Sequence, residues 1–357
     1  MRSRKLIGGG LIAALVALVA VGLWHTETAR DGEGGRIAIV REPQGVMGTT
    51  CALVAVVQPQ DRARAEAALD EAEEVLRTVE ARMSAWLEDS EVGHLNASAA
   101  NEKVALSPDT MAVLWAARDA AVATEGAFDV TCRPLIELWR NAGAVGRMPT
   151  EEEVEAARAR SRWDLIELSD DGATKRQSSV RVDLGGLAKG YAIGRAAEAL
   201  QRAGLSGGLV DVGGDLLCFG YQADGRPWTV EVKNPFAAER LGRLVLTDRA
   251  VCTSGNYARF TLIQGRRYSH IVDPRLGRPA DAVPSVTVVA PSALTADIWA
   301  TALSVLGPDG LDRMPEGVEA LMIVGSADDY RMLCTPGLRG LLAEPPPEGL
   351  TVWESDG

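Results

Sequence analysis

The sequence predicts an α+β protein in which helices and short strands are interspersed and the strands form mixed sheets. Apolar segments bounded by turn residues, such as Thr49–Val57 and Ser285–Ala290, indicate buried strands. Apolar residues at helical spacing between Asp61 and Met83 indicate an amphipathic helix. The chain has 357 residues, 46% of them hydrophobic, which is enough for one large domain or two small ones.

Two helices in the first half of the chain have capping residues at their expected ends. Ser107 followed by Pro108 predicts the start of one helix, and Gly126 lies just past its end. Thr150 and Glu153 have the spacing of a capping box, which predicts a helix over 151–162.

The second half of the chain is richer in strands. A strand at 180–182 is expected to lead through two glycines into a helix from about Leu187 to Ala203. A later helix is expected to begin at Thr295. Further strands are expected at 208–212, at 228–232, in several segments between Arg243 and Val272, at 285–290 and at 320–324.

The N-terminus has the pattern of a membrane signal. Arg2, Arg4 and Lys5 precede an uncharged segment, 6–24, which would span roughly 28 Å as a helix at ~1.5 Å per residue. We expect an uncleaved signal anchor in the cell inner membrane, with the body on the periplasmic or extracytoplasmic side; a cleaved signal peptide is the alternative. The predicted organisation is 1–30 signal anchor or signal peptide, 31–45 linker, 46–342 folded domain and 343–357 loosely ordered tail.

Charge and missing motifs exclude several classes of function. The net charge is −12, which disfavours binding to nucleic acid. The chain contains no GxGxxG after a strand, no GxxxxGK[ST] and no HExxH. The five cysteines are scattered without metal-ligand spacing, and we expect them to be small buried hydrophobic residues.

The segment from Asp183 to Lys189 is the first candidate for chemistry. It joins an expected strand to a helix through Gly185 and Gly186, so backbone can approach a ligand closely and the helix start favours an anion. A tight turn with an N-terminal acid and a solvated lysine is the structural alternative.

A second candidate lies at the start of the later helix. Asp297 and Thr301 are four residues apart and project from one helix face, and their oxygens suit a hard cation such as Mg²⁺. The alternative is a stabilising acid in the first helical turn.

His270 is the third candidate, because it is one of only three histidines in the chain. Histidine acts as a general base near neutral pH, although a lone histidine is also compatible with a structural role.

Taken in chain order, these segments resemble the ApbE family of FAD:protein FMN transferases, from about Met47 to Gly307. The resemblance rests on Met47-Gly-Thr-Thr50, Met83-Ser-Ala-Trp86 with Ser90-Glu91, Gly126-Ala-Phe-Asp129, Asp183-Leu-Gly-Gly-Leu-Ala-Lys-Gly190, Asp211-Val-Gly-Gly214, Thr253-Ser-Gly-Asn-Tyr257, Ser269-His-Ile-Val-Asp-Pro274 and Thr295-Ala-Asp297 with Thr301. It implies an ApbE-like, T-fold-related architecture with the active site in a cleft between two halves.

The resemblance also implies a reaction and its residues. FMN would pass from FAD to a threonine of an acceptor protein, with Mg²⁺ bound and AMP released; the partners known for the family are exported subunits of redox complexes. His270 would activate the acceptor threonine. The implied FAD contacts are Met47, Trp86, Ala127, Phe128, Asp129, Asp183, Lys189 and Ile271, and the implied metal ligands are Gly186 through its carbonyl, Asp297 and Thr301.

Some positions depart from the family pattern. Asn256 stands where the family commonly has Asp, Cys51 where it often has an aromatic residue, and Ala300 where members can supply a further metal-binding oxygen. The position of Trp86 varies between members, so the balance between transfer and hydrolysis is open. A Mg²⁺-dependent FAD pyrophosphatase and a non-catalytic FAD-binding protein are therefore the alternatives.

Overall fold

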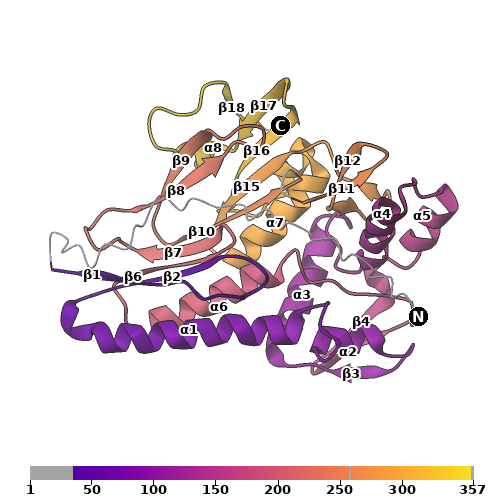
Figure 1. Cartoon of the computed structure of the whole chain (residues 1–357), viewed down its shortest axis with the longest axis horizontal. Coiled ribbons are helices and arrows are strands. Elements are labelled where there is room, and N and C mark those ends of the chain that lie inside the picture. Colours follow the sequence, from indigo (N-terminus) through magenta and orange to yellow (C-terminus); the bar gives the residue numbers. More distant parts are fainter. Residues whose placement is uncertain (1–34, 257–258, 355–357) are drawn as a thin grey trace, which may run out of the picture.

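A nine-stranded sheet organises the fold of the computed structural model, which describes residues 35–256 and 259–354 (Figure 1). Adjacent strands are antiparallel except for the last pair, which is parallel. In spatial order the strands are β1 (Ile37–Arg41), β2 (Cys51–Val57), β6 (Gly207–Val212), β7 (Asp215–Gly220), β10 (Arg249–Gly255), β15 (Ser285–Ala290), β16 (Glu319–Ser326), β17 (Asp329–Cys334) and β18 (Leu350–Val352).

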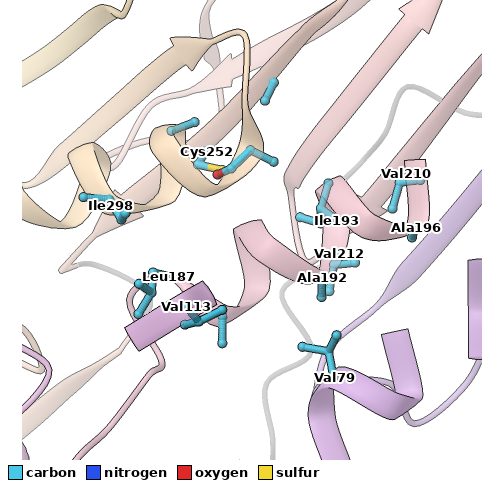
Figure 2. Close-up of a cluster of buried hydrophobic side chains, with 14 of the residues drawn as sticks. Val79, Val113, Leu187, Ala192, Ile193, Ala196, Val210, Val212, Cys252 and Ile298 are labelled. Carbon is cyan, nitrogen blue, oxygen red and sulfur yellow. The ribbon is translucent and has the colours of Figure 1, made fainter. Parts of the chain in front are cut away.

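Three long helices cover one face of this sheet: α1 (Arg62–Met83), α6 (Ala188–Arg202) and α7 (Ala293–Leu306). Figure 1 shows α1 and α6 side by side along the sheet. The main core lies between these helices and the sheet, and Figure 2 shows part of it, with Val79 of α1, Ile193 of α6 and Ile298 of α7. The spacing of apolar residues in α1 explains this burial, because Leu69, Leu76 and the residues between them at helical intervals share one face.

The other face of the sheet is covered by a hairpin of β8 (Trp228–Lys233) and β9 (Arg240–Leu246) and by the short helix α8 (Pro336–Arg339). Strand β2 contributes to both cores, since Leu53 and Ala55 face the helices while Val54 and Val56 face the hairpin side. Burial on both faces explains why β2 is apolar at every position.

Smaller elements complete the fold at the helical side (Figure 1). They are the helices α2 (Glu91–Ala97), α3 (Pro108–Ala123), α4 (Arg133–Val145) and α5 (Glu151–Arg158), the sheet of β3 (Lys103–Ala105), β5 (Gly172–Lys175) and β4 (Ile166–Ser169), the hairpins β11 (Phe260–Ile263) with β12 (Arg266–Ser269) and β13 (Val272–Asp273) with β14 (Arg278–Pro279), and the 3-10 turns η1 (Pro59–Asp61), η2 (Trp163–Leu165) and η3 (Pro308–Arg313).

The structure confirms the α+β class and several element boundaries. Strand β15 has the expected bounds, and the side chains of Ser107 and Thr150 cap α3 and α5 as predicted. The cysteines are unpaired, and all are buried except the half-buried Cys132.

Two expected helix ends were wrong. Helix α7 begins at Ala293 because Ser292, whose side chain accepts from Thr295 N, is its cap. Asp297 therefore lies in the second turn of the helix and not in the first. Helix α5 ends at Arg158, after which the chain turns toward Trp163, whose N–H donates to Asp129.

The strand expected at 180–182 was also wrong. Within the described residues this segment pairs with no strand. The side chain of Asn96 accepts from Val182 N (2.6 Å) and donates to Val182 O (2.9 Å) in place of a neighbouring strand.

Both terminal expectations need correction within the described residues. The expected linker, 31–45, contains β1, which pairs with β2. The tail after Leu342 is not loosely ordered up to residue 354, because β18 pairs with β17 and Trp353 N donates to Cys334 O (2.7 Å). The predicted signal anchor, 1–30, lies outside the described residues, and no helix within them is long and apolar enough to cross a membrane.

Candidate functional site

The site is built where α6 and α7 come into contact at Gly190. A Cβ at this position would lie 2.3 Å from Ala293 O and 2.7 Å from Asp297 Cβ, so only glycine permits this approach. The Gly190 N–H donates to Asp297 Oδ2 (2.8 Å). The short spacing between the helices therefore fixes the position of the Asp297 carboxylate, which is 5% exposed.

Buried acidic groups outnumber the cations around this contact. Lys189 forms an ion pair with Asp215, and the second oxygen of Asp215 accepts from Thr253 N (2.8 Å). Asp297 and Asp211 are also buried, and Asp211 accepts from Gly214 N (2.8 Å). Lys189, together with Lys233 near Asp211, thus faces three buried carboxylates, which leaves an excess of negative charge that favours a bound cation.

The pKa shifts of these groups have the same cause. Burial raises the pKa of Asp297, and the neighbouring charge of Asp215 raises it further. Burial also raises the pKa of Asp211 to about 6. Burial alone would disfavour the ammonium of Lys189, but the carboxylates of Asp215 and Asp297 outweigh burial and raise the pKa of that lysine. Lys189 therefore stays charged at pH 7.

Three oxygen-bearing groups converge beside this cluster. Thr301 lies one turn after Asp297, and its hydroxyl is 3.4 Å from Ser254 Oγ. A Cβ on Gly186 would be 3.4 Å from Thr301 Oγ1, so the backbone of the glycine turn lies directly against this threonine. A carboxylate, a hydroxyl and a backbone carbonyl are the hard ligands that Mg²⁺ prefers, so the residues present fit this ion. Within 35–256 and 259–354, no group of three or more His, Cys, Asp or Glu side chains has a metal-binding arrangement, at this site or elsewhere, so the fit to Mg²⁺ depends on the hydroxyl and carbonyl oxygens as well.

The segment 127–129 also lies next to Gly186. Phe128 is buried, and its ring carbon Cε2 is 3.2 Å from the position of a Cβ on Gly186. Asp129 accepts from Thr131 N (2.8 Å) and from Trp163 N (2.9 Å) through its two oxygens. Burial raises the pKa of Asp129, and these hydrogen bonds partly offset that shift. Asp129 therefore holds this loop in place beside buried Ala127, and a contact of its carboxylate with FAD stays a prediction.

Asp183 and Trp86 lie near two arginines that the sequence analysis did not identify. Asp183 Oδ1 accepts from Gly185 N (2.9 Å), and its Oδ2 lies 3.6 Å from Arg133 Nη1. The Trp86 ring is 63% exposed, with the guanidinium carbons of Arg133 and Arg140 at 4.7 and 5.0 Å from its centroid. An exposed aromatic face next to cations suits a planar, anionic ligand.

Met47 is fixed by its backbone. It has a left-handed conformation, with φ of 49°, and its N–H donates to Glu80 Oε2 (2.8 Å). The half-buried Met47 side chain is thereby held against the main core.

His270 directly follows β12 and lies at the surface. Its Nδ1 is 3.0 Å from Arg259 O, so in the neutral ring Nδ1 carries the proton and Nε2 is the basic nitrogen. Neighbouring atoms that displace water from the ring lower the pKa of His270, so this neutral form dominates at pH 7. The adjacent Ile271 is half-buried, and its carbonyl accepts from Ala280 N (2.9 Å).

The structure therefore brings together five of the twelve predicted site residues. Contacts join Phe128, Gly186, Thr301, Asp297 and Lys189 into one site. Arg275 Cγ lies 3.8 Å from a Cβ position on Gly126, which brings the segment after His270 next to the loop that carries Phe128. Of the motif Thr253–Tyr257, residue Tyr257 lies outside the described residues.

Sequence reasoning missed four residues of this region. Asp215 directly follows the motif that ends at Gly214, and Ser254 lies inside the motif Thr253–Tyr257. The motifs could therefore have indicated both residues. Arg133 and Arg140 belong to no motif identified in the sequence, and only their positions in α4 place them over Trp86.

Comparison with known proteins identifies close relatives. The model of the ApbE family matches residues 47–322. A FAD:protein FMN transferase from Vibrio cholerae is 33% identical over 306 residues, which cover 84% of this chain and 91% of the relative. One from Haemophilus influenzae is 32% identical over 318 residues, covering 86% and 88%.

Solved structures show the same similarity in three dimensions. The flavin transferase ApbE from Vibrio cholerae superimposes with a TM-score of 0.74 at 31% identity, covering 86% of this chain and 99% of that structure. The apo form of the Pseudomonas stutzeri flavinyl transferase ApbE gives a TM-score of 0.75 at 30% identity, covering 86% and 96%.

Proposed function

This chain belongs to the ApbE family, and from that premise we propose that it is an enzyme that transfers FMN from FAD to another protein. The convergence of Asp297, Thr301 and Gly186 beside Lys189 carries this proposal. Such an arrangement suits a pyrophosphate, which an acidic protein binds only through local positive charge.

We further propose that the site binds Mg²⁺ through Asp297, Thr301 and the carbonyl of Gly186. When bound, this ion supplies positive charge that neutralises phosphate oxygens during phosphoryl transfer. Lys189 contributes a second positive charge that its carboxylate neighbours keep protonated. The glycine turn lets backbone approach the ligand, and Asp183, Trp86, Met47, Asp129 and Ile271 are the proposed further contacts of FAD.

The acceptor is proposed to be a threonine hydroxyl, with His270 as its base. Nε2 of His270 takes the hydroxyl proton, since Nδ1 is engaged with Arg259 O. The threonine oxygen then forms a bond to the FMN-side phosphorus, while the bond from this phosphorus to the bridging oxygen breaks. AMP leaves with the bridging oxygen, and one phosphoester bond replaces one phosphoanhydride bond.

Partner and location follow as further proposals. The acceptor is proposed to be an exported subunit of a redox complex, carrying a threonine in a flavinylation motif. Residues 1–30 are proposed to anchor the protein in the inner membrane with its body on the periplasmic side. A measured mass of the native protein that includes residues 1–30 would support this.

The test is to incubate the protein with FAD, Mg²⁺ and an acceptor domain that carries the threonine motif. We expect AMP and a flavin-fluorescent, mass-shifted acceptor in equal amounts. Free FMN with an unmodified acceptor would instead assign a pyrophosphatase. Tight FAD binding without AMP would assign a non-catalytic flavin-binding protein.

A further inference from the structure

The β11–β12 hairpin has two different faces. Thr261, Ile263 and Tyr268 point toward α4: Ile263 is buried, Thr261 Cγ2 lies 2.3 Å from a Cβ position on Gly143, and the Tyr268 ring is 5.5 Å from that of Trp139. The register pairs Phe260 with Ser269 and Leu262 with Arg267 on the opposite, outer face. Figure 1 shows the hairpin beside α4 at one end of the molecule.

The outer face of the hairpin is apolar and accessible. Phe260 is 41% exposed and Leu262 55% exposed, although they are large hydrophobic residues. The guanidinium carbon of Arg267 lies 4.4 Å from the centroid of the Phe260 ring. Exposed apolar side chains next to arginine are typical of the centre of a protein interface.

The charge of this hairpin is opposite to that of the whole chain. Arg259, Arg266 and Arg267 are exposed, and the sequence from Arg259 to His270 contains no acidic residue, while the net charge of the chain is −12. Within the described part of the chain, none of these three arginines forms an ion pair. Of the nearby acids, Asp273 pairs with Arg275, while the exposed Asp281 accepts from Ser269 N (2.7 Å) and is, among the described residues, the one acidic side chain bonded to the hairpin backbone.

The hairpin also lies next to the proposed base. His270 follows β12 without a gap, and its ring is bound to the carbonyl of Arg259 at the start of β11. Within residues 35–256 and 259–354, β11 and β12 pair only with each other, but Leu262 O lies 3.5 Å from a Cβ position on Gly143 of α4 and Ser269 N donates to Asp281, so the accessible part of the hairpin is its outer face and not its edges. An extended segment on this hairpin would therefore pass His270.

We propose that the outer face of this hairpin, formed by Phe260, Leu262 and Arg267, docks an extended acidic segment of the acceptor protein, with the exposed Arg266, which pairs with Ile263 and lies over the Tyr268 ring, adding positive charge beside it. The arginines attract the acidic residues, and the two apolar side chains cover part of the segment. The acceptor hydroxyl is thereby presented to His270. This inference rests on the proposed function, because it assigns where that acceptor binds.

Two short peptides test it, each with a single threonine, flanked by aspartates in one and by lysines in the other. Their binding to the full chain in detergent is measured by fluorescence anisotropy at low and high salt. R266E/R267E is compared with R243E/R331E, which makes the same change in net charge at exposed arginines outside the hairpin.

We expect the aspartate peptide to bind wild type and R243E/R331E alike, to bind R266E/R267E about tenfold more weakly, and to lose affinity with salt. R266E/R267E should instead prefer the lysine peptide and retain the affinity of wild type for FAD. Equal binding of both peptides, no binding of either, or equal effects of the two double variants would overturn the proposal.

The same variants also show whether lipid or a second copy of the chain binds this face of the hairpin instead. Binding to phosphatidylglycerol vesicles that R266E/R267E abolishes, without any effect on the peptides, would assign the face to lipid and overturn the proposal. A dimer in sedimentation that R266E/R267E dissociates would assign it to a second copy of the chain. AMP release from FAD, measured on the same samples, reports on the proposed function separately, since peptide binding does not require catalysis.

Discussion

Replacement of Gly190 by alanine tests whether the α6–α7 contact builds the site. The new Cβ would lie 2.3 Å from Ala293 O and 2.7 Å from Asp297 Cβ, and a backbone carbonyl cannot rotate away as a side chain can. Such overpacking destabilises by about 1–3 kcal/mol. Weakening the hydrogen bond from Gly190 N to the Asp297 carboxylate adds about 1.5–3 kcal/mol. The better helix propensity of alanine offsets about 1 kcal/mol, so we expect a net loss of about 3 kcal/mol.

Gly194 provides the matched control. It lies one turn later in α6, and nothing is within 4 Å of a Cβ at this position. Gly194→Ala should therefore stabilise the protein by about 0.5–1 kcal/mol through helix propensity alone. Urea unfolding of both variants gives these values, and titration with Mg²⁺ and FAD should show weakened binding for Gly190→Ala only. If the two variants have equal stability and equal ligand affinity, the helix contact does not position Asp297.

The remaining predictions concern His270, Asp297 and Lys175. His270→Ala should slow FMN transfer far more than it weakens FAD binding, because the base acts on the acceptor; stopped-flow binding beside single-turnover transfer measures both, and parallel losses would contradict the role. Asp297→Ala should abolish AMP formation, measured by chromatography, and full activity of this variant in chelator-treated buffer would refute the metal role. Lys175 is fully buried, and burial lowers its pKa to about 8. In the unfolded chain the pKa of this lysine is near the ordinary 10.5. Between pH of about 8 and 10.5 the unfolded state therefore binds more protons than the folded state, so the protein becomes less stable as pH falls. The stabilisation from neutral Lys175 is lost as pH falls through about 8. When pH rises from 7.5 to 9.5, the free energy of unfolding of wild type, measured with denaturant, should increase by about 2 kcal/mol relative to that of Lys175→Met. The same pH dependence in both proteins would refute the pKa shift.

Local sequence patterns correctly predicted the elements whose structure is determined by their own residues. Ser285–Ala290 is rich in apolar and β-branched residues and forms β15, and the capping box of Thr150 and Glu153 starts α5. The failure at 180–182 has a tertiary cause, since this segment looks like a strand but is held by the distant side chain of Asn96 and by Lys175, which donates to Val180 O (3.3 Å). No short-range pattern reports such contacts.

The candidate site divides in the same way. Asp297 and Thr301 are predictable from helical spacing, and the resemblance to the family added Gly186 and Lys189. Asp215, which pairs with Lys189 across 26 positions of sequence, depends on how β7 lies beside α6. Arg140 approaches Trp86 only because α4 folds back next to the turn after α1. Contacts between elements decide these positions, so sequence spacing alone does not reveal them.

The location of the metal in a complex with FAD tests the central claim most directly. Crystals of the protein grown with FAD and Mn²⁺, which replaces Mg²⁺ and has a measurable anomalous signal, locate the ion and the pyrophosphate together. We expect the anomalous peak in direct contact with Asp297 and Thr301, with phosphate oxygens completing its ligands and Lys189 beside them. A peak at other residues, or a pyrophosphate distant from this pair, would contradict the account.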